Sequence, residues 1–346
     1  LTEARIDGIV AAVRELIALP DPIGRMTKME TRPNGLQIGR KTVPLGVIAI
    51  IYEARPNVTV DAAALCLKSG NVCILRGGKE AIRSNRCAVE LMRGALSAAG
   101  LPEDCINLVQ DTSRESANEL MHLNGYVDVL IPRGGAGLIR AVASQASVPV
   151  IRTGEGVCHV YVDSDADLDM AAEILYNAKC SRPSVCNAVE CVLIHEAVAE
   201  AFLQKAVPLL DRHKVELRCD EASRAILGER AIAAADADWD AEYDDYILAV
   251  RVVKSLDEAM EFIAAHGTQH SECIVTESYP KAQRFLNEVD AAAVYVNAST
   301  RFTDGGEFGM GAEIGISTQK MHARGPMGLE ELTSYKYIVY GSGQVR

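Results

Sequence analysis

Short apolar runs alternate along the first half of the chain with segments of helical period. Residues 46–52 form a continuous β-branched run between Pro44 and Pro56, which predicts a buried strand. Residues 58–68 have the helical period and end at Gly70, a residue that helices favour as a C-cap. The same alternation predicts further strands over 71–76, 105–109, 126–131 and 148–151, and helices over 81–99, from 113 and from 137. Such a rhythm predicts βαβ units and a parallel sheet with helices on both faces.

The second half repeats the alternation. Strands are expected over 190–195, 247–253, 273–276 and 292–297, and helices over 168–179, 197–210, 257–266 and 280–287. Residues 236–245 hold six acids among ten positions, a run that predicts a solvated loop. Residues 29–43 and 333–339 fit neither half, and each is expected to be an edge strand completed by another subunit.

Composition narrows the class of protein. The 346 residues are 49% hydrophobic and 24% charged, which predicts a globular protein of two or three domains. The net charge of −12 argues against a surface for nucleic acid or anionic membranes. No apolar run reaches the roughly 18 residues that a membrane span needs. Residues 1–20 show no signal-peptide pattern, and because Leu1 is not a start methionine, we expect a processed or trimmed chain, or one whose first segment is missing.

The ten cysteines form no C-x-x-C motif and no zinc-finger spacing. We therefore expect no metal, reduced thiols in the cytoplasm, and nine core-filling cysteines beside one candidate nucleophile. That candidate is Cys186, in the polar loop Ser181-Arg-Pro-Ser-Val-Cys186 between a helix and a strand. The neighbouring Arg182 would lower its thiol pKa. The alternative is a buried, unreactive cysteine.

Ligands bind parallel sheets at the carboxyl ends of the strands, so the loops there are the other candidates. Asn57 follows the first strand and can donate its amide to an oxyanion, or it can cap the next helix. The run Arg76-Gly77-Gly78-Lys79 and the pair Gly134-Gly135 join strands to helices. Their backbone N–H groups can bind phosphate, which favours a dinucleotide site, although turn glycines are the plainer alternative.

Two further features are ambiguous. Residues 302–315 form a glycine-rich run that is too long for a simple turn, so we expect either a functional loop or a lid or linker without contacts. Cys158 and His159 can be a metal pair, but without a further ligand at useful spacing they are better explained as packing residues at a strand end.

Taken together, these segments resemble the aldehyde dehydrogenase superfamily, and within it the gamma-glutamyl phosphate reductases. The resemblance covers essentially the whole chain. Its segments lie at residues 51–64, 182–187 (Arg-Pro-Ser-Val-Cys-Asn), 297–304 (Asn-Ala-Ser-Thr-Arg-Phe-Thr-Asp), 313–320 (Glu-Ile-Gly-Ile-Ser-Thr-Gln-Lys) and 322–331. No single motif is decisive, but the ordered set is specific.

The resemblance implies an α/β fold with two Rossmann-like parallel-sheet domains and a β oligomerisation flap. The implied cofactor domain covers 1–23 and 45–166, the catalytic domain 167–320, and the flap 24–44 and 321–346. Family members begin with further helices that pack on the cofactor domain, so an N-terminal part is expected to be missing here. The flap implies a homo-oligomer, either a dimer or a tetramer.

The resemblance also implies the chemistry: reduction of L-glutamyl 5-phosphate with NADPH to glutamate 5-semialdehyde and phosphate, the second step of proline synthesis from glutamate. Cys186 would form a thioester, and Asn57 with the Cys186 backbone N–H would hold the oxyanion. Functional coupling to glutamate 5-kinase is a further expectation for an enzyme with this activity. Implied cofactor residues are Arg76, Gly77, Gly78, Lys79, Ser84, Gly134, Gly135 and Glu242. Arg182 and Arg301 are the expected anchors for substrate phosphate or carboxylate, or else structural ion pairs.

One departure from the superfamily bears on the reaction. Oxidising members carry a general-base glutamate where this chain has Arg152, although Glu155 lies close enough to be confused with it in a shifted alignment. A base that activates water would hydrolyse a thioester, so its absence favours reduction. The alternatives are a CoA-acylating aldehyde dehydrogenase and a truncated oligomer without turnover.

Overall fold

The computed structural model describes residues 2–53 and 56–346. The chain divides into two units, one formed by residues 1–153 with 305–346 and the other by residues 154–304. We refer to them as unit 1 and unit 2. The domain bounds expected from the sequence remain a prediction.

Unit 1 is built on a four-stranded sheet in the order β5-β4-β3-β6, and every neighbouring pair is parallel. The order reverses beside β3, as in doubly wound folds, so the loops after β3 and β6 lie at the switch point where such folds bind ligands. The strands are β3 (Val47–Tyr52), β4 (Val72–Arg76), β5 (Ile106–Leu108) and β6 (Val129–Arg133). The helices are α1 (Glu3–Ala18), α2 (Pro56–Lys68), α3 (Ile82–Ala98), α4 (Arg114–Leu120) and α5 (Ala136–Gln145).

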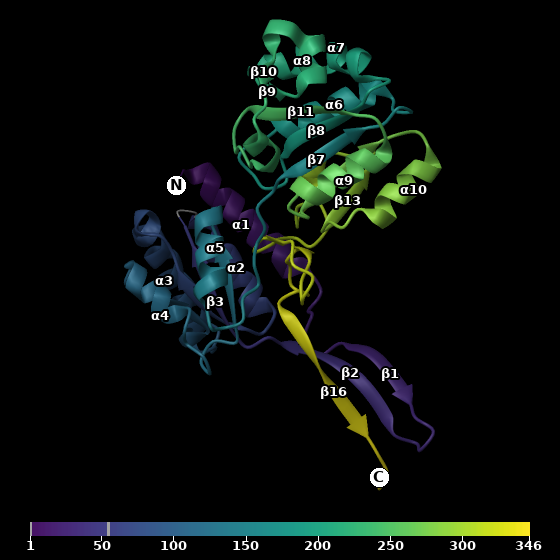
Figure 1. Ribbon diagram of the computed structural model, residues 1–346. Helices are drawn as coiled ribbons and strands as arrows, with labels where there is room; N and C mark the ends of the chain where they lie inside the picture. The colour runs from purple at the N-terminus through teal and green to yellow at the C-terminus, as the bar shows by residue number, and fades with distance from the viewer. Residues whose placement is uncertain (1, 54–55) are drawn as a thin grey trace. The chain divides into compact units, whose positions relative to one another are not determined.

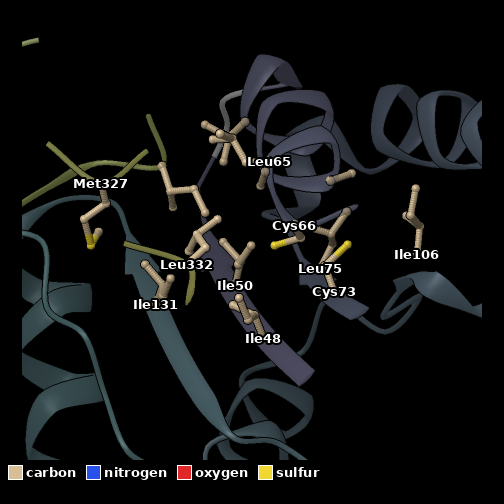
Figure 2. Close-up of a cluster of buried hydrophobic side chains, with 14 of the residues drawn as sticks. Ile48, Ile50, Leu65, Cys66, Cys73, Leu75, Ile106, Ile131, Met327 and Leu332 are labelled. Atoms are coloured by element: carbon tan, nitrogen blue, oxygen red, sulfur yellow. The ribbon is translucent and has the colours of Figure 1, made fainter. Parts of the chain in front are cut away.

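The core of unit 1 forms where the continuous apolar run of β3 meets its neighbours. Ile48 and Ile50 are fully buried, and Leu65 and Cys66 from α2 pack into the same cluster (Figure 2). Met327 and Leu332, near the end of the chain, join this cluster. The C-terminal segment is therefore part of the unit that begins the chain.

A separate three-stranded antiparallel sheet belongs to unit 1 and runs in the order β1-β2-β16 (Figure 1). Its strands are β1 (Met26–Thr31), β2 (Gln37–Pro44) and β16 (Thr333–Tyr340). The two segments that fitted neither half of the sequence pattern therefore pair with each other. Every residue of β1 is exposed, and so are most of those in β16.

Unit 2 contains a seven-stranded parallel sheet in the order β10-β9-β11-β8-β7-β12-β13. Its strands are β7 (Cys158–Val162), β8 (Val189–His195), β9 (Glu216–Cys219), β10 (Ile232–Ala233), β11 (Ile247–Val253), β12 (Ser271–Val275) and β13 (Ala293–Val296). Its helices are α6 (Leu168–Cys180), α7 (Ala199–Leu210), α8 (Glu221–Leu227), α9 (Leu256–His266) and α10 (Tyr279–Glu288). The expected pair of parallel α/β units is confirmed.

The structure corrects the sequence pattern at four places. Residues 148–151 form no strand, only an isolated bridge between Val150 and Leu130. Strand β7 and the β9-α8-β10 segment were not expected. The acidic run is only partly a solvated loop, because Asp236–Asp240 forms a 3₁₀ turn and buried Asp238 pairs with Arg218 at 3.1 Å. Two further short strands, β14 (Ile316–Ser317) and β15 (Gly325–Pro326), pair with each other in an antiparallel arrangement.

Among the described residues, no helix has the length and apolar content to cross a membrane. All ten cysteines are free. Seven of them are buried, while Cys105 and Cys186 are partly exposed and Cys87 is exposed. Cys105 packs against the unit 1 core, so of the nine expected core fillers only Cys87 is exposed.

Candidate active site

Cys186 lies in unit 2, in the loop between α6 and β8, and its side chain is partly exposed. The loop therefore meets the sheet at the amino end of β8. A buried ion pair joins the two ends of this loop, because Lys179 Nζ lies 2.6 Å from Glu190 Oε2. Burial raises the pKa of Glu190 to about 8 against the opposing effect of Lys179. The nucleophile loop is thus fixed at its base.

The residue after the cysteine anchors the loop a second time. Asn187 is buried, and its side-chain amide donates to the carbonyl oxygen of Thr303 at 2.9 Å. Its own carbonyl accepts a hydrogen bond of 2.7 Å from Thr300 Oγ1. Arg301 donates to the side-chain oxygen of Asn187 and, at 3.1 Å, to Ser181 Oγ. Arg301, expected as a substrate anchor, therefore holds both sides of the nucleophile loop.

Gly156 packs directly against Cys186. A β-carbon added to Gly156 would overlap the carbonyl group of Cys186 and stand 2.6 Å from its Cα. The N–H of Gly156 donates to Glu242 Oε1 at 2.9 Å. Burial raises the pKa of Glu242, and this hydrogen bond from Gly156 opposes the rise. Glu242, expected to bind the cofactor, is thus connected to the nucleophile loop through Gly156.

Arg182 differs from Arg301. It is exposed in the nucleophile loop and, within the described parts of the chain, makes no hydrogen bond or ion pair. Its guanidinium is therefore available to an anionic substrate group near Cys186.

Asn57 belongs to unit 1 and lies in the first turn of α2, after the carboxyl end of β3. Its amide nitrogen donates to Asp61 Oδ2 one turn later, at 3.2 Å. Burial raises the pKa of Asp61, while this hydrogen bond lowers it. Among the described residues, no backbone N–H donates to the Asn57 side chain, so the capping alternative is not supported. One of its two amide protons remains for another acceptor.

The loop after β4 carries most of the predicted cofactor residues. Arg76 donates through Nη2 to the carbonyl oxygens of Thr112 and Ser113, at 2.7 and 2.5 Å. Gly77 is buried, Gly78 is partly exposed, Lys79 is exposed, and Ser84 lies in the first turn of α3. Lys79 is therefore the cation of this loop that solvent reaches most freely.

The loop after β6 is separated from the loop after β4 by strand β3, which pairs with both strands. Gly135 is the N-cap of α5, and its N–H donates to Glu53 Oε2 at 3.0 Å. Gly134 also approaches the Glu53 carboxylate closely. An anionic oxygen already binds at this helix N-terminus, so the predicted phosphate-binding loop fits an anion. The residues present therefore fit a dinucleotide.

Cys158 and His159 belong to β7, and both are fully buried. His159 Nδ1 lies 3.0 Å from Glu272 Oε2, whereas Cys158 Sγ donates to the carbonyl oxygen of Cys186 at 3.2 Å. Over residues 2–53 and 56–346, no three His, Cys, Asp or Glu side chains gather as metal ligands would. Sequence reasoning missed the contact between Cys158 and the nucleophile, because nothing in the local pattern indicated it.

The glycine-rich run folds on itself on the unit 1 side. The N–H of Gly305 donates to Glu313 Oε2 at 3.0 Å, and the N–H of Met310 donates to the Gly305 carbonyl at 2.7 Å. The run therefore has contacts of its own, which a bare linker would lack.

The sequence of the chain matches that of a known protein family. The model of the aldehyde dehydrogenase family matches residues 2–226. The chain belongs to this family. It is therefore an oxidoreductase of the class expected from its motifs, with a nicotinamide cofactor.

Individual relatives are more specific. The chain is similar to the gamma-glutamyl phosphate reductase of Halothermothrix orenii, with 61% identity over 100% of this chain and 82% of that protein. The protein of the same name from Clostridium perfringens is 60% identical over 100% of this chain and 83% of its own length. The resemblance found from the sequence motifs is therefore confirmed.

Solved structures agree. Gamma-glutamyl phosphate reductase from Thermotoga maritima is 50% identical and has a TM-score of 0.97, covering 100% of this chain and 83% of that one. An acetylating aldehyde dehydrogenase from Geobacillus thermoglucosidasius is 18% identical, with a TM-score of 0.74 over 97% of this chain and 82% of that one. That second likeness shows the fold alone. The expected aldehyde dehydrogenase-like fold class is confirmed.

Proposed function

We propose that this chain reduces L-glutamyl 5-phosphate to L-glutamate 5-semialdehyde and phosphate, using NADPH and a thioester on Cys186. The observation that carries the proposal is the nucleophile loop. It presents a partly exposed cysteine four positions after the exposed Arg182, which pairs with none of the described residues, and buried hydrogen bonds of Asn187 hold its backbone. The similarity to gamma-glutamyl phosphate reductases over the whole chain supports this choice of substrate.

Cys186 Sγ attacks the acyl carbonyl as a thiolate, and phosphate leaves as the carbon–sulfur bond forms. The negative charge that develops on the carbonyl oxygen is held by the backbone N–H of Cys186 and by the amide of Asn57. Asp61 occupies one amide proton of Asn57 and thereby orients the other. The cation of Arg182 favours both the thiolate and the phosphate.

The nicotinamide cofactor, when bound, supplies the hydride that takes the acyl group to the aldehyde level. In our proposal, Arg76, Gly77, Gly78, Lys79, Ser84, Gly134, Gly135 and Glu242 hold it. The cations Arg76 and Lys79 would select the phosphorylated cofactor, with Lys79 the more exposed of the two. Cys186 is released as a thiolate when the aldehyde departs.

Arg152 supports reduction rather than oxidation. A guanidinium stays protonated and takes no proton from water, so this position does not activate water against the thioester. The backbone N–H of Arg152 donates to Gln319 Oε1 at 3.0 Å. The thioester is therefore protected from hydrolysis and remains available for reduction by hydride.

The assembly and its partners are part of the same proposal. The β1-β2-β16 sheet is the candidate oligomerisation flap, because its outer strands are exposed along most of their length. A dimer or tetramer would cover it. Acyl phosphates are labile, so we also propose functional coupling to glutamate 5-kinase in the cytoplasm.

The test runs the reaction in reverse. Wild type, Cys186→Ala and the matched control Cys87→Ala receive glutamate semialdehyde, phosphate and NADP⁺, and NADPH absorbance is followed. We expect phosphate-dependent reduction in wild type and Cys87→Ala, and a loss of roughly a thousandfold or more in Cys186→Ala. Equal turnover with NAD⁺ would contradict the cofactor assignment. Turnover with CoA in place of phosphate would instead favour the CoA-acylating alternative.

A further inference from the structure

Cys158 is the first residue of β7, and its side chain is fully buried behind the nucleophile loop. Its Sγ donates to the carbonyl oxygen of Cys186 at 3.2 Å. Burial, reinforced by the charge of Glu272, raises the pKa of the Cys158 thiol well above its usual range. The thiol therefore keeps its proton at neutral pH and is a hydrogen-bond donor, not a second nucleophile.

Cys158 is also part of a buried polar network that returns to the same loop. Its Sγ lies 3.7 Å from Nδ1 of His270, which lies 2.8 Å from Ser271 Oγ. Ser271 Oγ lies 2.6 Å from Thr303 Oγ1. The carbonyl of Thr303 accepts the side-chain amide of Asn187, the residue after the nucleophile. The carbonyl of the Cys186–Asn187 peptide and the side-chain amide of Asn187 are thus connected to one network.

The backbone of the residues that precede Cys158 in the sequence also restricts the Cys186 carbonyl. Gly156 leaves no room for a β-carbon beside the Cys186 carbonyl group. The N–H of Val157 donates to Thr268 Oγ1 at 3.0 Å, which holds this segment in place. The Cys186 peptide therefore rests between a backbone surface and a buried thiol donor.

We propose that Cys158 is a positioning residue, whose S–H hydrogen bond to the Cys186 carbonyl fixes the nucleophile loop in the orientation that catalysis needs. This inference rests on the proposed function, because it takes Cys186 as the nucleophile. Without the thiol, the carbonyl of Cys186 loses this donor, and the orientation of the peptide is less well fixed. The reactive sulfur would then point away from the acyl carbonyl for part of the time.

The test compares three substitutions at one position. Cys158→Ala and Cys158→Val both remove the donor, Ala with a smaller side chain than cysteine and Val with a slightly larger one, whereas Cys158→Ser keeps a donor. We expect kcat to fall about three- to tenfold in the Ala and Val variants with KM nearly unchanged, and to return to within about twofold of wild type in the Ser variant. The matched control is Cys191→Ala, a buried cysteine on the neighbouring strand β8. We expect it to lower the melting temperature but not kcat.

A second readout separates this inference from the proposed reaction. Alkylation of Cys186 by iodoacetamide is followed against pH, with mass spectrometry to resolve the site. We expect the pH midpoint to shift in Cys158→Ala and to be restored in Cys158→Ser, because the loop conformation sets the N–H groups and charges around the thiolate. If wild type showed no phosphate-dependent turnover, the proposed reaction would fail, and this midpoint alone would decide the role of Cys158. Wild-type kcat in the Val variant, or an unmoved midpoint in the Ala variant, would overturn the inference.

Discussion

The two parallel sheets place their candidate residues at opposite ends of their strands. In unit 1, Asn57, the Arg76–Lys79 loop and Gly134–Gly135 follow the carboxyl ends of β3, β4 and β6. In unit 2, Gly156, Cys186 and Glu242 precede the amino ends of β7, β8 and β11. In our proposal, the rule that ligands bind parallel sheets at the carboxyl ends of the strands therefore applies to unit 1 and not to unit 2.

The carboxyl end of the unit 2 sheet shows why. Its strand order reverses between β7 and β12, and at that point Asp163 is fully buried. The Asp163 carboxylate accepts hydrogen bonds from Thr276 Oγ1 at 2.7 Å and from Lys281 Nζ at 3.0 Å. Side chains of the protein itself thus fill the position where a ligand would bind in a doubly wound sheet.

Strand topology alone therefore does not show at which end of a parallel sheet a functional site lies. At the amino ends, loops from separate strands meet, and close backbone contact with side-chain hydrogen bonds fixes them. At the carboxyl ends of the unit 1 strands, helix N-termini would provide the cofactor-binding groups that we propose. Catalysis by a fixed side chain and binding of an anionic cofactor by backbone N–H groups can therefore occur at opposite ends of the strands in the two sheets.

Among substitutions that leave the nucleophile itself in place, the largest effect is expected from Gly156→Ala. A β-carbon there overlaps the Cys186 carbonyl, and the obstacle is backbone, so the nucleophile loop must move. A displacement of this kind costs roughly a hundredfold or more in kcat/KM. The measurement is the reverse assay, with circular dichroism to show that the variant is folded.

Gly94→Ala is the matched control for that variant. Gly94 lies inside α3, and nothing stands within 4 Å of an added β-carbon. Alanine should stabilise the helix by about 0.5–1 kcal/mol and leave kcat/KM unchanged. If Gly156→Ala behaved like Gly94→Ala, the close contact at the amino end of the sheet would not position the nucleophile.

Lys281→Met tests the other end of the same sheet. The Asp163 carboxylate would stay buried with one donor fewer, which should cost about 1–3 kcal/mol, since Lys281 is itself partly exposed. Well below the melting temperature, kcat should not change, because no candidate residue lies at this end. Denaturant unfolding and the reverse assay measure the two effects separately.

The same variant has a defined pH dependence. Burial raises the pKa of Asp163, but the hydrogen bonds from Thr276 and Lys281 outweigh it and leave this pKa below its ordinary value. A carboxyl with a lowered folded-state pKa contributes stability above its unfolded pKa of about 3.9, and that contribution is lost as the pH falls through the folded pKa. The stability gap between wild type and Lys281→Met should therefore narrow in acid. A gap that stayed constant down to the lowest pH would show that lost packing, not charge, causes it.

The sequence predicted the βαβ units because continuous apolar runs bounded by proline and glycine are a strong local signal. Gly70, for example, ends α2 with the positive φ of 73° that its predicted cap requires. The pattern failed at β7, where the polar pair Cys158-His159 hides a fully buried strand. Its polar atoms find partners in Cys186 and Glu272, which lie 28 and 113 residues away in sequence. Local periodicity carries no information about such partners.

In the candidate site, too, local features could be predicted from the sequence and long-range contacts could not. Cys186 and the glycine loops could be predicted, because a cysteine in a polar loop and glycines at strand ends are local features. The structural role of Arg301 could not be predicted, because its hydrogen bonds to Asn187 and Ser181 depend on the tertiary fold. Glu53 was missed for a related reason: its partner Gly135 is 82 residues away.

The smallest effect is expected at that contact, in unit 1. Glu53 Oε2 accepts the N–H of Gly135 at the start of α5, where the proposed cofactor phosphate would bind. A carboxylate at a helix N-terminus contributes about 0.3–1 kcal/mol, so Glu53→Gln should weaken this competition and tighten NADPH binding by roughly two- to fivefold. Titration of NADPH fluorescence measures the dissociation constant, with Glu80→Gln, an exposed acid at the β4 loop, as the matched control. If Glu53→Gln left NADPH affinity unchanged while Glu80→Gln raised it, the cofactor anion would be held after β4 rather than after β6.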